Sequence, residues 1–426
     1  MNQKFAKIHS VNGSLSFSGD KSISHRVLLI SALAEGKSIV RNLSRSADVD
    51  STIKCLTDLG VQIEASGDDY FINGRGFKGF KKPSAELNAG NSGTTARLLS
   101  GILAVQEFDS VIIGDSSLSS RPMNRVIEPL TKMGASIQSN NEGRLPLYFS
   151  APENLISIRY NMPIASAQVK SAILLAGLHL DRETTVVETS QTRNHTENLL
   201  GLNVLSAENK IISYVSKKNY PFPKEYFIPG DISSAIFFVV LTLLSPNSEI
   251  VLKKVLLNST RIESLNILQK MGGDIQVNEL GVSNNEVYGD VIVKSSELSN
   301  VQIKKEIIPS IIDEIPALTI AGIFADGKFE LNGASELRVK ESDRIKSLIT
   351  NLMKVDLDID EFSDGYSISG NAKKPLAAFN SFGDHRIAMA LGILSSLLED
   401  GGEVENFECV NVSNPDFLKQ LYLVSN

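Results

Sequence analysis

The sequence predicts a mixed α and β protein of two similar domains, each built from three related units. Three observations lead to this prediction: the length of the chain, six recurring apolar segments, and a recurring phrase that ends the amphipathic helices between them. At 426 residues the chain is longer than one hydrophobic core usually supports, which favours two domains.

Six segments open with small polar residues and continue into an Ala-, Leu- and Ile-rich stretch of helical length. They begin at Gly19, Asn91, Ser166, Gly230, Asp313 and Gly383, with spacings of 72, 75, 64, 83 and 70 residues. Such spacings are too long for a solenoid repeat and suit a supersecondary unit that is used six times. Because these stretches are apolar nearly all round, we expect six buried helices.

A second, amphipathic helix follows in most units and ends in a similar phrase each time. The three clearest examples are CLTDLGVQIE (55–64), PLTKMGASIQ (129–138) and ILQKMGGDIQ (267–276). Glycine after Leu or Met suits a left-handed residue at a helix C-terminus, and the alternating residues after it predict a strand. Each unit therefore reads as a helix, a strand, an amphipathic helix and further short strands.

The starts GDKSISH near residue 20 and GDISSA near residue 230 look like the same position in two copies. We therefore expect a domain boundary at 222–229, within the proline-bearing stretch YPFPKEYFIPG. The first domain is predicted over 19–228. The second is predicted over 229–426 together with 1–18, whose opening strand is expected to cross back to it.

Composition excludes several classes of function. The net charge of −7 lacks the basic character of a nucleic-acid-binding protein. Cys55 and Cys409 are the only cysteines, so a cysteine-rich metal site is excluded and a reducing compartment is favoured. No apolar run approaches the roughly 18 residues of a membrane span, and the N-terminus has no features of a targeting peptide. We expect a cytoplasmic protein without nucleic-acid or membrane partners.

The starts of the six apolar helices are candidate anion-binding positions. A helix N-terminus presents unpaired N–H groups and the positive end of the helix dipole, and basic residues lie close to these starts. They are Lys21, Arg26, Arg97, Arg121, Arg125, Lys170, Arg193, Lys340, Arg344 and Arg386. For any one site, N-capping by Ser, Asp or Asn and solvated surface charge remain equally good explanations; the convergence of all of them favours a site for anionic ligands.

Two carboxylates are candidates for general acid or base chemistry. Asp313 stands at the head of an apolar helix in PSIIDEIPALTIAG, and Glu341 lies between Lys340 and Arg344. The alternatives are an N-cap for Asp313 and a surface charge cluster for Glu341. His385 and His195 belong to no His, Cys or HExxH cluster, so no metal is expected. Asp48 and Asp50 resemble a metal-binding pair, but capping of the helix that follows is the favoured explanation.

The hexapeptide GRGFKG (74–79) matches the GxGxxG pattern of dinucleotide-binding proteins. It leads into FKKPS rather than into a helix, so we interpret it as a glycine-rich hairpin. The sequence also lacks the GxxxxGK[ST] motif of nucleotide-driven motors and the GxSxG motif of esterases.

Six segments, in order along nearly the whole chain, resemble the signature segments of the EPSP synthase family. They are GDKSISHR, NSGTTARLL, SRPM, SAQVKSAILLAG, ELRVKESDR and GDHRIAMA. The resemblance implies two similar domains, each of three βαβαββ units with helix N-termini facing the cleft between the domains. It also implies a transferase that joins shikimate 3-phosphate to phosphoenolpyruvate with release of phosphate. We expect no cofactor, and we expect a monomer although the sequence does not reveal the oligomeric state.

The matching motifs also imply the roles of individual residues. Those expected to bind shikimate 3-phosphate are Lys21, Ser22, Arg26, Ser166, Gln168, Arg193, Asp313 and Lys340. Those expected to bind phosphoenolpyruvate are Lys21, Asn91, Gly93, Arg121, Gln168, Arg344 and Arg386. Asp313 is expected to accept the proton of the attacking 5-hydroxyl, Glu341, with Lys21, to handle the proton at the methylene carbon, and His385 to orient neighbouring groups.

The chain departs from the family pattern at two places. Val412 and Asn414 occupy a segment in which many members carry a lysine, and Ala167 stands where some members have a second serine. The alternative function is that of the sister transferase acting on UDP-N-acetylglucosamine. Its members generally carry a cysteine in the loop before the Arg-Pro motif, where this chain reads SSLSSRP.

Overall fold

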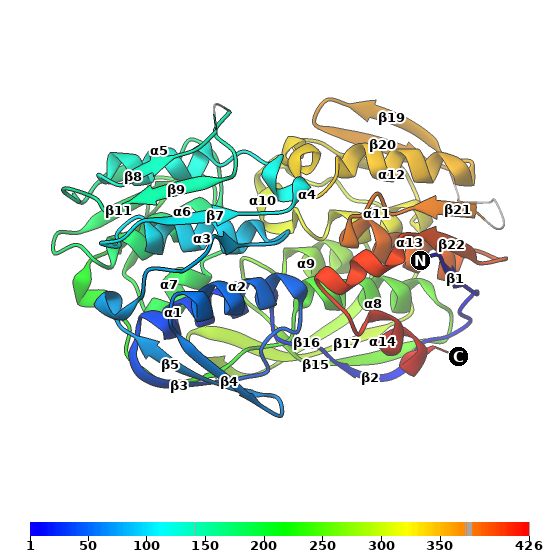
Figure 1. The fold of residues 1–426 in the computed structure, drawn as a ribbon. Helices are drawn as coiled ribbons and strands as arrows, with labels where there is room; N and C mark the ends of the chain where they lie inside the picture. The colour runs from blue at the N-terminus through cyan, green and yellow to red at the C-terminus, as the bar shows by residue number, and fades with distance from the viewer. Residues whose placement is uncertain (141, 371, 373–376, 426) are drawn as a thin grey trace. The chain divides into compact units, whose positions relative to one another are not determined.

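The computed structural model describes residues 1–140, 142–370, 372 and 377–425, and the chain divides into two compact units. The first unit comprises Gly19–Ile228 together with Val282–Glu286. The second unit comprises Met1–Ser18, Pro229–Gly281 and Val287–Asn426. Figure 1 labels the helices and strands of both.

The first unit contains three four-stranded sheets, in the orders β14-β3-β5-β4, β6-β7-β9-β8 and β10-β11-β13-β12. Its strands are β3 (Glu35–Arg41), β4 (Gln62–Ser66), β5 (Asp69–Arg75), β6 (Leu87–Asn88), β7 (Ser110–Ile113), β8 (Ser136–Gln138), β9 (Leu147–Ser150), β10 (Arg159–Asn161), β11 (Thr184–Glu188), β12 (Val204–Ala207), β13 (Lys210–Val215) and β14 (Glu225–Phe227). Its helices are α1 (Lys21–Leu33), α2 (Ala47–Asp58), α3 (Gly93–Leu103), α4 (Ser116–Ser119), α5 (Asn124–Lys132), α6 (Ala167–Gly177) and α7 (His195–Leu200).

The same strand pairing recurs in each sheet of the first unit. One parallel pair lies at an edge (β14 with β3, β6 with β7, β10 with β11), and the remaining pairs are antiparallel. The repeat seen in the sequence is therefore a repeat of sheet topology as well as of helices.

The second unit also contains three sheets, in the orders β16-β17-β15-β2, β18-β20-β19 and β1-β22-β21. Its strands are β1 (Gln3–Phe5), β2 (Asn12–Ser16), β15 (Glu249–Leu256), β16 (Asp274–Ser283), β17 (Glu286–Lys294), β18 (Phe329–Leu331), β19 (Asp358–Phe362), β20 (Gly365–Ser369), β21 (Ala377–Asn380) and β22 (Gly402–Glu405). Its helices are α8 (Ile232–Leu244), α9 (Glu263–Lys270), α10 (Ile308–Ile311), α11 (Ile315–Phe324), α12 (Arg344–Leu352), α13 (His385–Leu397) and α14 (Phe417–Val424).

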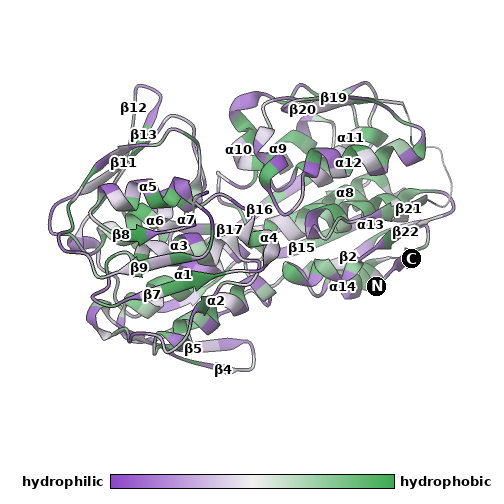
Figure 2. Ribbon diagram, turned by 45° about the horizontal axis from the view of Figure 1, so that its top comes forward, coloured by the Kyte–Doolittle hydropathy of each residue, from purple (hydrophilic) through white to green (hydrophobic). Residues whose placement is uncertain are grey.

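Three apolar helices form the interior of each unit, as predicted. In the first unit α1 and α6 both pack against α3, and in the second α8, α11 and α13 pack against one another. Nearly every residue of α8 and α13 is buried, so these helices have no solvent-facing side. Their hydropathy can be followed in Figure 2. The predicted mixture of α and β structure with repeated units is thus confirmed.

Polar residues fix where five of the six apolar helices begin. The side chains of Asp20, Ser92, Ser166, Asp231 and Asp384 each accept a hydrogen bond from a backbone N–H of the first turn. The sixth helix, α11, begins after Glu314, which makes no capping hydrogen bond through its side chain. Asp313 therefore lies one residue before the N-cap, and the capping explanation for Asp313 is wrong.

The predicted helix ends are confirmed. Gly60, Gly134 and Gly272 have φ angles of +88°, +95° and +104°, a region that glycine enters without steric cost. They follow α2, α5 and α9, and the strands β4, β8 and β16 begin two residues later.

The hexapeptide GRGFKG differs from its interpretation as a hairpin. Gly74 and Arg75 end β5, and Phe77–Gly79 form a short 3-10 helix. A Cβ at Gly74 would lie 1.9 Å from the carbonyl oxygen of Ala34, so this glycine lets β5 pass close to the end of α1. After this 3-10 helix, residues 80–86 form neither a helix nor a strand.

Among the described residues, no single helix has the length and apolar character needed to cross a membrane. By length and composition only, one pair of helices bent by 115°, Lys305–Ile311 with Ile315–Phe324, meets the requirement when taken together.

Gly101 on α3 provides a test of how closely the interior helices pack. A Cβ at this position would lie 2.2 Å from the carbonyl oxygen of Ala172 on α6, and backbone cannot move as a side chain can. We expect Gly101→Ala to lower the free energy of unfolding by about 1–3 kcal/mol, as measured by chemical denaturation. Gly281→Ala is the control and should cost less, because its φ lies outside the left-handed region and its Cβ would meet only the side chain of Tyr288, at 3.3 Å. Equal losses in the two variants would contradict close packing at Gly101.

Candidate active site

Lys21 is the first residue of α1, and its ammonium group faces the start of α2. Its Nζ lies 2.9 Å from Oδ2 of Asp48, and both side chains are mostly buried. Asp48 lies in the first turn of α2, whose N-cap is Ser46. The capping role expected for Asp48 and Asp50 is therefore wrong: the helix begins earlier, and Asp48 is the partner of Lys21.

The guanidinium of Arg26 lies inside the first unit, one helical turn beyond Ser22. Its Nε donates to Oγ1 of Thr196 at 2.9 Å, its Nη2 to Oγ of Ser171 at 2.7 Å, and its Nη1 to the carbonyl oxygen of Ser22 at 2.8 Å. These bonds engage three of the five N–H donors of the side chain. Burial lowers the pKa of Arg26 to about 10, so the side chain remains cationic at neutral pH.

Arg193 approaches the start of α1 from the segment just before α7. Its Nη1 lies 3.4 Å from Oγ of Ser22. Ser22 therefore has Arg193 at its hydroxyl and Arg26 at its carbonyl oxygen. The structure brings together these three predicted residues from two separate helix starts.

A second group in the first unit surrounds the start of α3. Nη2 of Arg121 donates to Oδ1 of Asn91 at 2.9 Å and to Oγ of Ser117 at 3.1 Å. Nearby, the side-chain amide of Gln168 on α6 accepts from Nη1 of Arg97 at 2.7 Å and donates to Oγ1 of Thr94 at 3.0 Å.

Gly93 leaves room for these arginines. A Cβ at Gly93 would lie 2.8 Å from Nη1 of Arg97 and 3.6 Å from Nη1 of Arg121. A side chain at this position would therefore require the tip of Arg97 to shift, whereas its distance to Arg121 would be an ordinary contact.

A chain of buried polar side chains links α1, α2 and α3. Nδ1 of His25 lies 2.7 Å from Oγ1 of Thr52, which lies 2.7 Å from Oγ1 of Thr95, and the latter is 2.8 Å from Oγ of Ser92. Burial, with the nearby charges of Lys21 and Arg26, holds the pKa of His25 well below its ordinary value. His25 is thus neutral at physiological pH and serves the packing of the helix starts.

In the second unit, Arg344 gathers three carboxylates. Its Nε lies 2.8 Å from Oδ2 of Asp384, its Nη2 lies 2.7 Å from Oε2 of Glu341, and its Nη1 lies 3.3 Å from Oδ1 of Asp313. Burial acts to lower the pKa of Arg344, but the charges of Asp384, Glu341 and Asp313 outweigh it and raise the pKa. Nζ of Lys340 lies 3.5 Å from the same oxygen of Asp313.

The start of α13 lies beside the start of α8. Nη1 of Arg386 donates to the carbonyl oxygen of Ser233 at 3.1 Å. His385 is the first residue of α13, directly before Arg386, and its side chain is buried. The acidic candidates and the predicted arginines of the second unit therefore share one cluster of helix starts.

The sequence analysis did not identify the buried charged residues that contact this cluster. Glu314 is fully buried and accepts a hydrogen bond from the hydroxyl of Ser233, which in turn accepts one from Arg261. Arg261 also lies 3.7 Å from Asp231, the N-cap of α8. A buried charge must be paired or hydrogen-bonded. The sequence does not show which residues form these pairs, because the partners are 28 to 81 positions apart.

Lys170 does not belong with the anion-binding candidates. Its Nζ lies 2.7 Å from Oε2 of Glu188 and 2.7 Å from Oε1 of Glu197, and the side chain is 1% exposed. Two carboxylates neutralise this ammonium group inside the protein, so the prediction that it faces a ligand is wrong.

The two departures from the family pattern lie in ordered structure. Asn414 is buried, and its Nδ2 donates to Oε1 of Gln420 at 2.9 Å. Ala167 is the first residue of α6, directly after the N-cap Ser166, whose hydroxyl accepts from the N–H of Val169 at 3.4 Å. Neither position places a cationic side chain near the clusters above.

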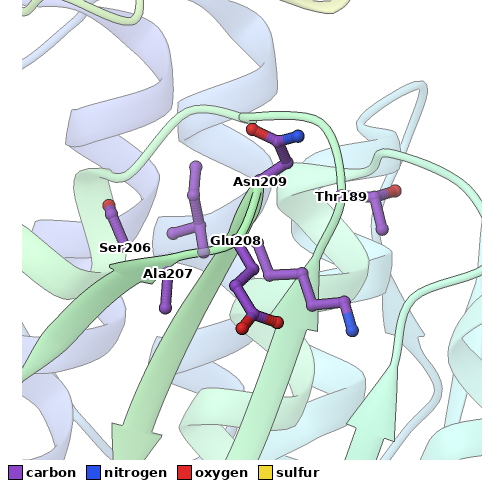
Figure 3. A pocket seen from close by; sticks show the side chains of 7 residues that line it. Thr189, Ser206, Ala207, Glu208 and Asn209 are labelled. Carbon is purple, nitrogen blue, oxygen red and sulfur yellow. The ribbon is translucent and has the colours of Figure 1, made fainter.

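A pocket of about 510 Å³ lies beside the turn between β12 and β13, shown in Figure 3. Its lining includes Thr189, Glu208, Asn209 and Lys210, and none of the predicted site residues. Among the described residues, no group of three or more His, Cys, Asp or Glu side chains could hold a metal ion.

The chain is similar to one family of proteins over nearly its full length. Residues 5–421 match the family described as EPSP synthase (3-phosphoshikimate 1-carboxyvinyltransferase). The 3-phosphoshikimate 1-carboxyvinyltransferase of Petrotoga mobilis is 44% identical over 414 residues, which cover 96% of each chain. The enzyme of that name from Bacillus subtilis is 42% identical over 421 residues, or 98% of each chain.

Solved structures agree with this similarity. The EPSP synthase from Acinetobacter baumannii is 38% identical, with a TM-score of 0.87 over 100% of this chain and 98% of that one. The enolpyruvyl transferase NikO from Streptomyces tendae has a TM-score of 0.74 over 99% of this chain and 96% of that one, but only 12% identity, which shows a shared fold alone.

Proposed function

The chain belongs to the EPSP synthase family, and we propose how its two groups of charged side chains divide the work of the family's reaction. That reaction transfers the 1-carboxyvinyl group of phosphoenolpyruvate to the 5-hydroxyl of shikimate 3-phosphate and releases phosphate by addition and elimination. It belongs to the biosynthesis of chorismate and the aromatic amino acids. The alternative, transfer to UDP-N-acetylglucosamine, is not favoured, because the relatives above carry the 3-phosphoshikimate name.

Shikimate 3-phosphate carries a phosphate and a carboxylate, and the first unit offers fixed cations for both. Arg193 and Arg26 flank Ser22, so hydroxyl and guanidinium donors already lie together there. Charge-assisted hydrogen bonds of this kind contribute about 1.5–3 kcal/mol each. The proposed ligands from the first unit are Lys21, Ser22, Arg26, Ser166, Gln168 and Arg193, and those from the second unit are Asp313 and Lys340.

Phosphoenolpyruvate is proposed to bind to arginines that are already held in position. Arg121 is fixed by Asn91 and Ser117, and Arg386 by the backbone of Ser233. A cation that is held before the ligand arrives loses little freedom on binding. The proposed ligands are Lys21, Asn91, Gly93, Arg121, Gln168, Arg344 and Arg386.

The proposed mechanism rests on one observation: Arg344 forms ion pairs with both Asp313 and Glu341. In the addition step an alcohol proton must leave while the methylene carbon gains a proton, and in the elimination step that carbon loses one. Asp313 is proposed to take the proton of the 5-hydroxyl. Glu341, with Lys21, is proposed to serve the methylene carbon, and His385 to orient its neighbours. Acid–base groups and fixed positive charge suffice for this chemistry.

We place the protein in the cytoplasm as a monomer that acts on small molecules. Two cysteines in the whole sequence suit a reducing compartment, and the net charge of −7 offers no attraction to nucleic acid.

The test of this function is phosphate release from phosphoenolpyruvate, measured with and without shikimate 3-phosphate. We expect release only when both substrates are present, and we expect the rate to be unchanged after treatment with EDTA, because no step above requires a metal. Release with UDP-N-acetylglucosamine in place of shikimate 3-phosphate would contradict the substrate. Loss of activity in EDTA that added metal restores would contradict the metal-free mechanism.

A further inference from the structure

The turn between β16 and β17 belongs to the first unit, although most of both strands belongs to the second. Asn284 and Asn285 form this two-residue turn with φ angles of 51° and 64°, as expected for a type I′ turn. Asn284 Nδ2 donates to the carbonyl oxygen of Glu225 at 3.2 Å, and Ser283 Oγ donates to that of Phe227 at 2.8 Å. The turn is therefore fixed beside β14.

Glu286 follows this turn and is buried against α7. Its Oε1 lies 2.8 Å from Nδ1 of His195 and 3.2 Å from Nδ2 of Asn198, and the carboxylate is 1% exposed. His195 and Asn198 are three residues apart, so they lie on one face of α7. A single buried carboxylate thus holds one face of this helix. Asn285 adds a hydrogen bond from its Nδ2 to the carbonyl oxygen of Asn198 at 2.9 Å.

The helix that Glu286 holds is too short to fix its own position. α7 has six residues, and its N-cap Asn194 makes no capping hydrogen bond through its side chain. Helices of this length owe their stability to tertiary contacts. Other side chains of α7 contact different partners: Thr196 accepts from Nε of Arg26 at 2.9 Å, and Glu197 pairs with Lys170 at 2.7 Å.

Arg193 stands two residues before His195, so its backbone position depends on where α7 lies. We propose that Glu286 is a positioning residue for shikimate 3-phosphate: by holding His195 and Asn198, it places α7 so that Arg193 reaches Ser22. This inference rests on the proposed role of Arg193 as a ligand of shikimate 3-phosphate. Glu286 itself touches no substrate in this account.

The test is the equilibrium Kd of shikimate 3-phosphate, measured by calorimetry for the wild-type chain and for Glu286→Gln. Glutamine keeps the shape but loses the charge that strengthens the bond to His195. We expect the Kd for shikimate 3-phosphate to rise about tenfold, which corresponds to the weakening of a charge-assisted hydrogen bond to a neutral one. The KM for phosphoenolpyruvate and kcat at saturating shikimate 3-phosphate should change less than about threefold.

Glu249→Gln is the matched control, because Glu249 lies on β15 of the same sheet, is exposed and pairs only at the surface with Lys294. It should leave the Kd unchanged. An unchanged Kd in Glu286→Gln would overturn the inference. If Glu286→Gln does not fold, Asn198→Ala is the second variant, because it removes a neutral donor to the same carboxylate. It should raise the Kd about threefold. An unchanged Kd in Asn198→Ala would also overturn the inference.

A double-mutant cycle separates positioning of Arg193 from general loosening of the fold. In an Arg193→Ala background, Glu286→Gln should raise the Kd less than about twofold, because the residue through which it acts is gone. The same tenfold rise in both backgrounds would overturn the inference. If the wild-type chain itself does not bind shikimate 3-phosphate, the proposed function fails first, and the two failures are distinguished before any variant is made.

Discussion

Replacing Asp313 by asparagine is expected to lower kcat by about 100-fold or more, with the Kd of both substrates changed by less than about threefold. The reason is that asparagine keeps the size of the side chain but cannot take up the proton of the attacking hydroxyl. Oδ1 of Asp313 already lies 3.3 Å from Arg344 and 3.5 Å from Lys340, so the carboxylate is oriented before substrate arrives. Single-turnover kinetics would measure the chemical step directly.

Asp274→Asn is the matched control for this variant. Asp274 is exposed at the start of β16 in the same unit, and the same change there should leave kcat unaltered. A near-normal chemical step in Asp313→Asn would remove Asp313 from the role of general base. A large rise in the Kd of shikimate 3-phosphate with kcat preserved would leave Asp313 with its proposed binding role alone.

Lys170→Met is expected to lower the free energy of unfolding by about 3–5 kcal/mol, because it leaves Glu188 and Glu197 buried without their cation. Both carboxylates lie 2.7 Å from the ammonium group. The measurement is chemical denaturation at several pH values. Lys132→Met, which breaks an exposed ion pair with Glu128 on α5, is the control and should change little.

The pH dependence of the Lys170 effect follows from its pKa. Burial acts to lower the pKa of Lys170, but the charges of Glu197 and Glu188 outweigh it, so the pKa in the folded protein is raised. A raised pKa gives a stabilisation that is complete below the unfolded-state pKa of about 10.4 and is lost as the pH rises through the folded-state value. Lys170 itself keeps its charge between pH 6 and pH 9. In Lys170→Met, however, the two buried carboxylates have lost their cation and should take up protons more readily as the pH falls, so the loss of unfolding free energy should be larger at pH 9 than at pH 6. A loss that is larger at pH 6 than at pH 9 would contradict the charge-pair explanation.

The helix starts could be predicted from sequence because their signals are local. Asp20, Ser92 and Asp384 each cap a helix within two or three residues of themselves, and the glycines that end α2, α5 and α9 act on their own backbone. For α11 the sequence suggests Asp313 as the capping residue, whereas the N-cap is Glu314, one residue later. There, α11 follows a series of turns rather than a capped start, so no capping residue marks its beginning.

The partners of buried charges could not be predicted, because they come from distant parts of the chain. Lys170 and Glu197 are separated by 27 residues, and His195 and Glu286 by 91. A lysine beside a helix start looks the same in sequence whether it faces a ligand or two glutamates. Only the fold shows that Lys170 is neutralised inside the protein while Lys21 remains partly exposed beside Asp48.

The first strands of the chain pair with strands that are made much later. β1 pairs with β22, at residues 402–405, and β2 pairs with β15, at residues 249–253. At a synthesis rate of about 5–20 residues per second, roughly 20–80 seconds pass between the synthesis of β1 and that of β22. Most of the first unit, residues 19–228, is by contrast one continuous stretch, and only Val282–Glu286 is added later. The two opening strands are thus synthesised well before their partners, and both pairings require closure of a long loop of chain, which makes them slow steps of folding.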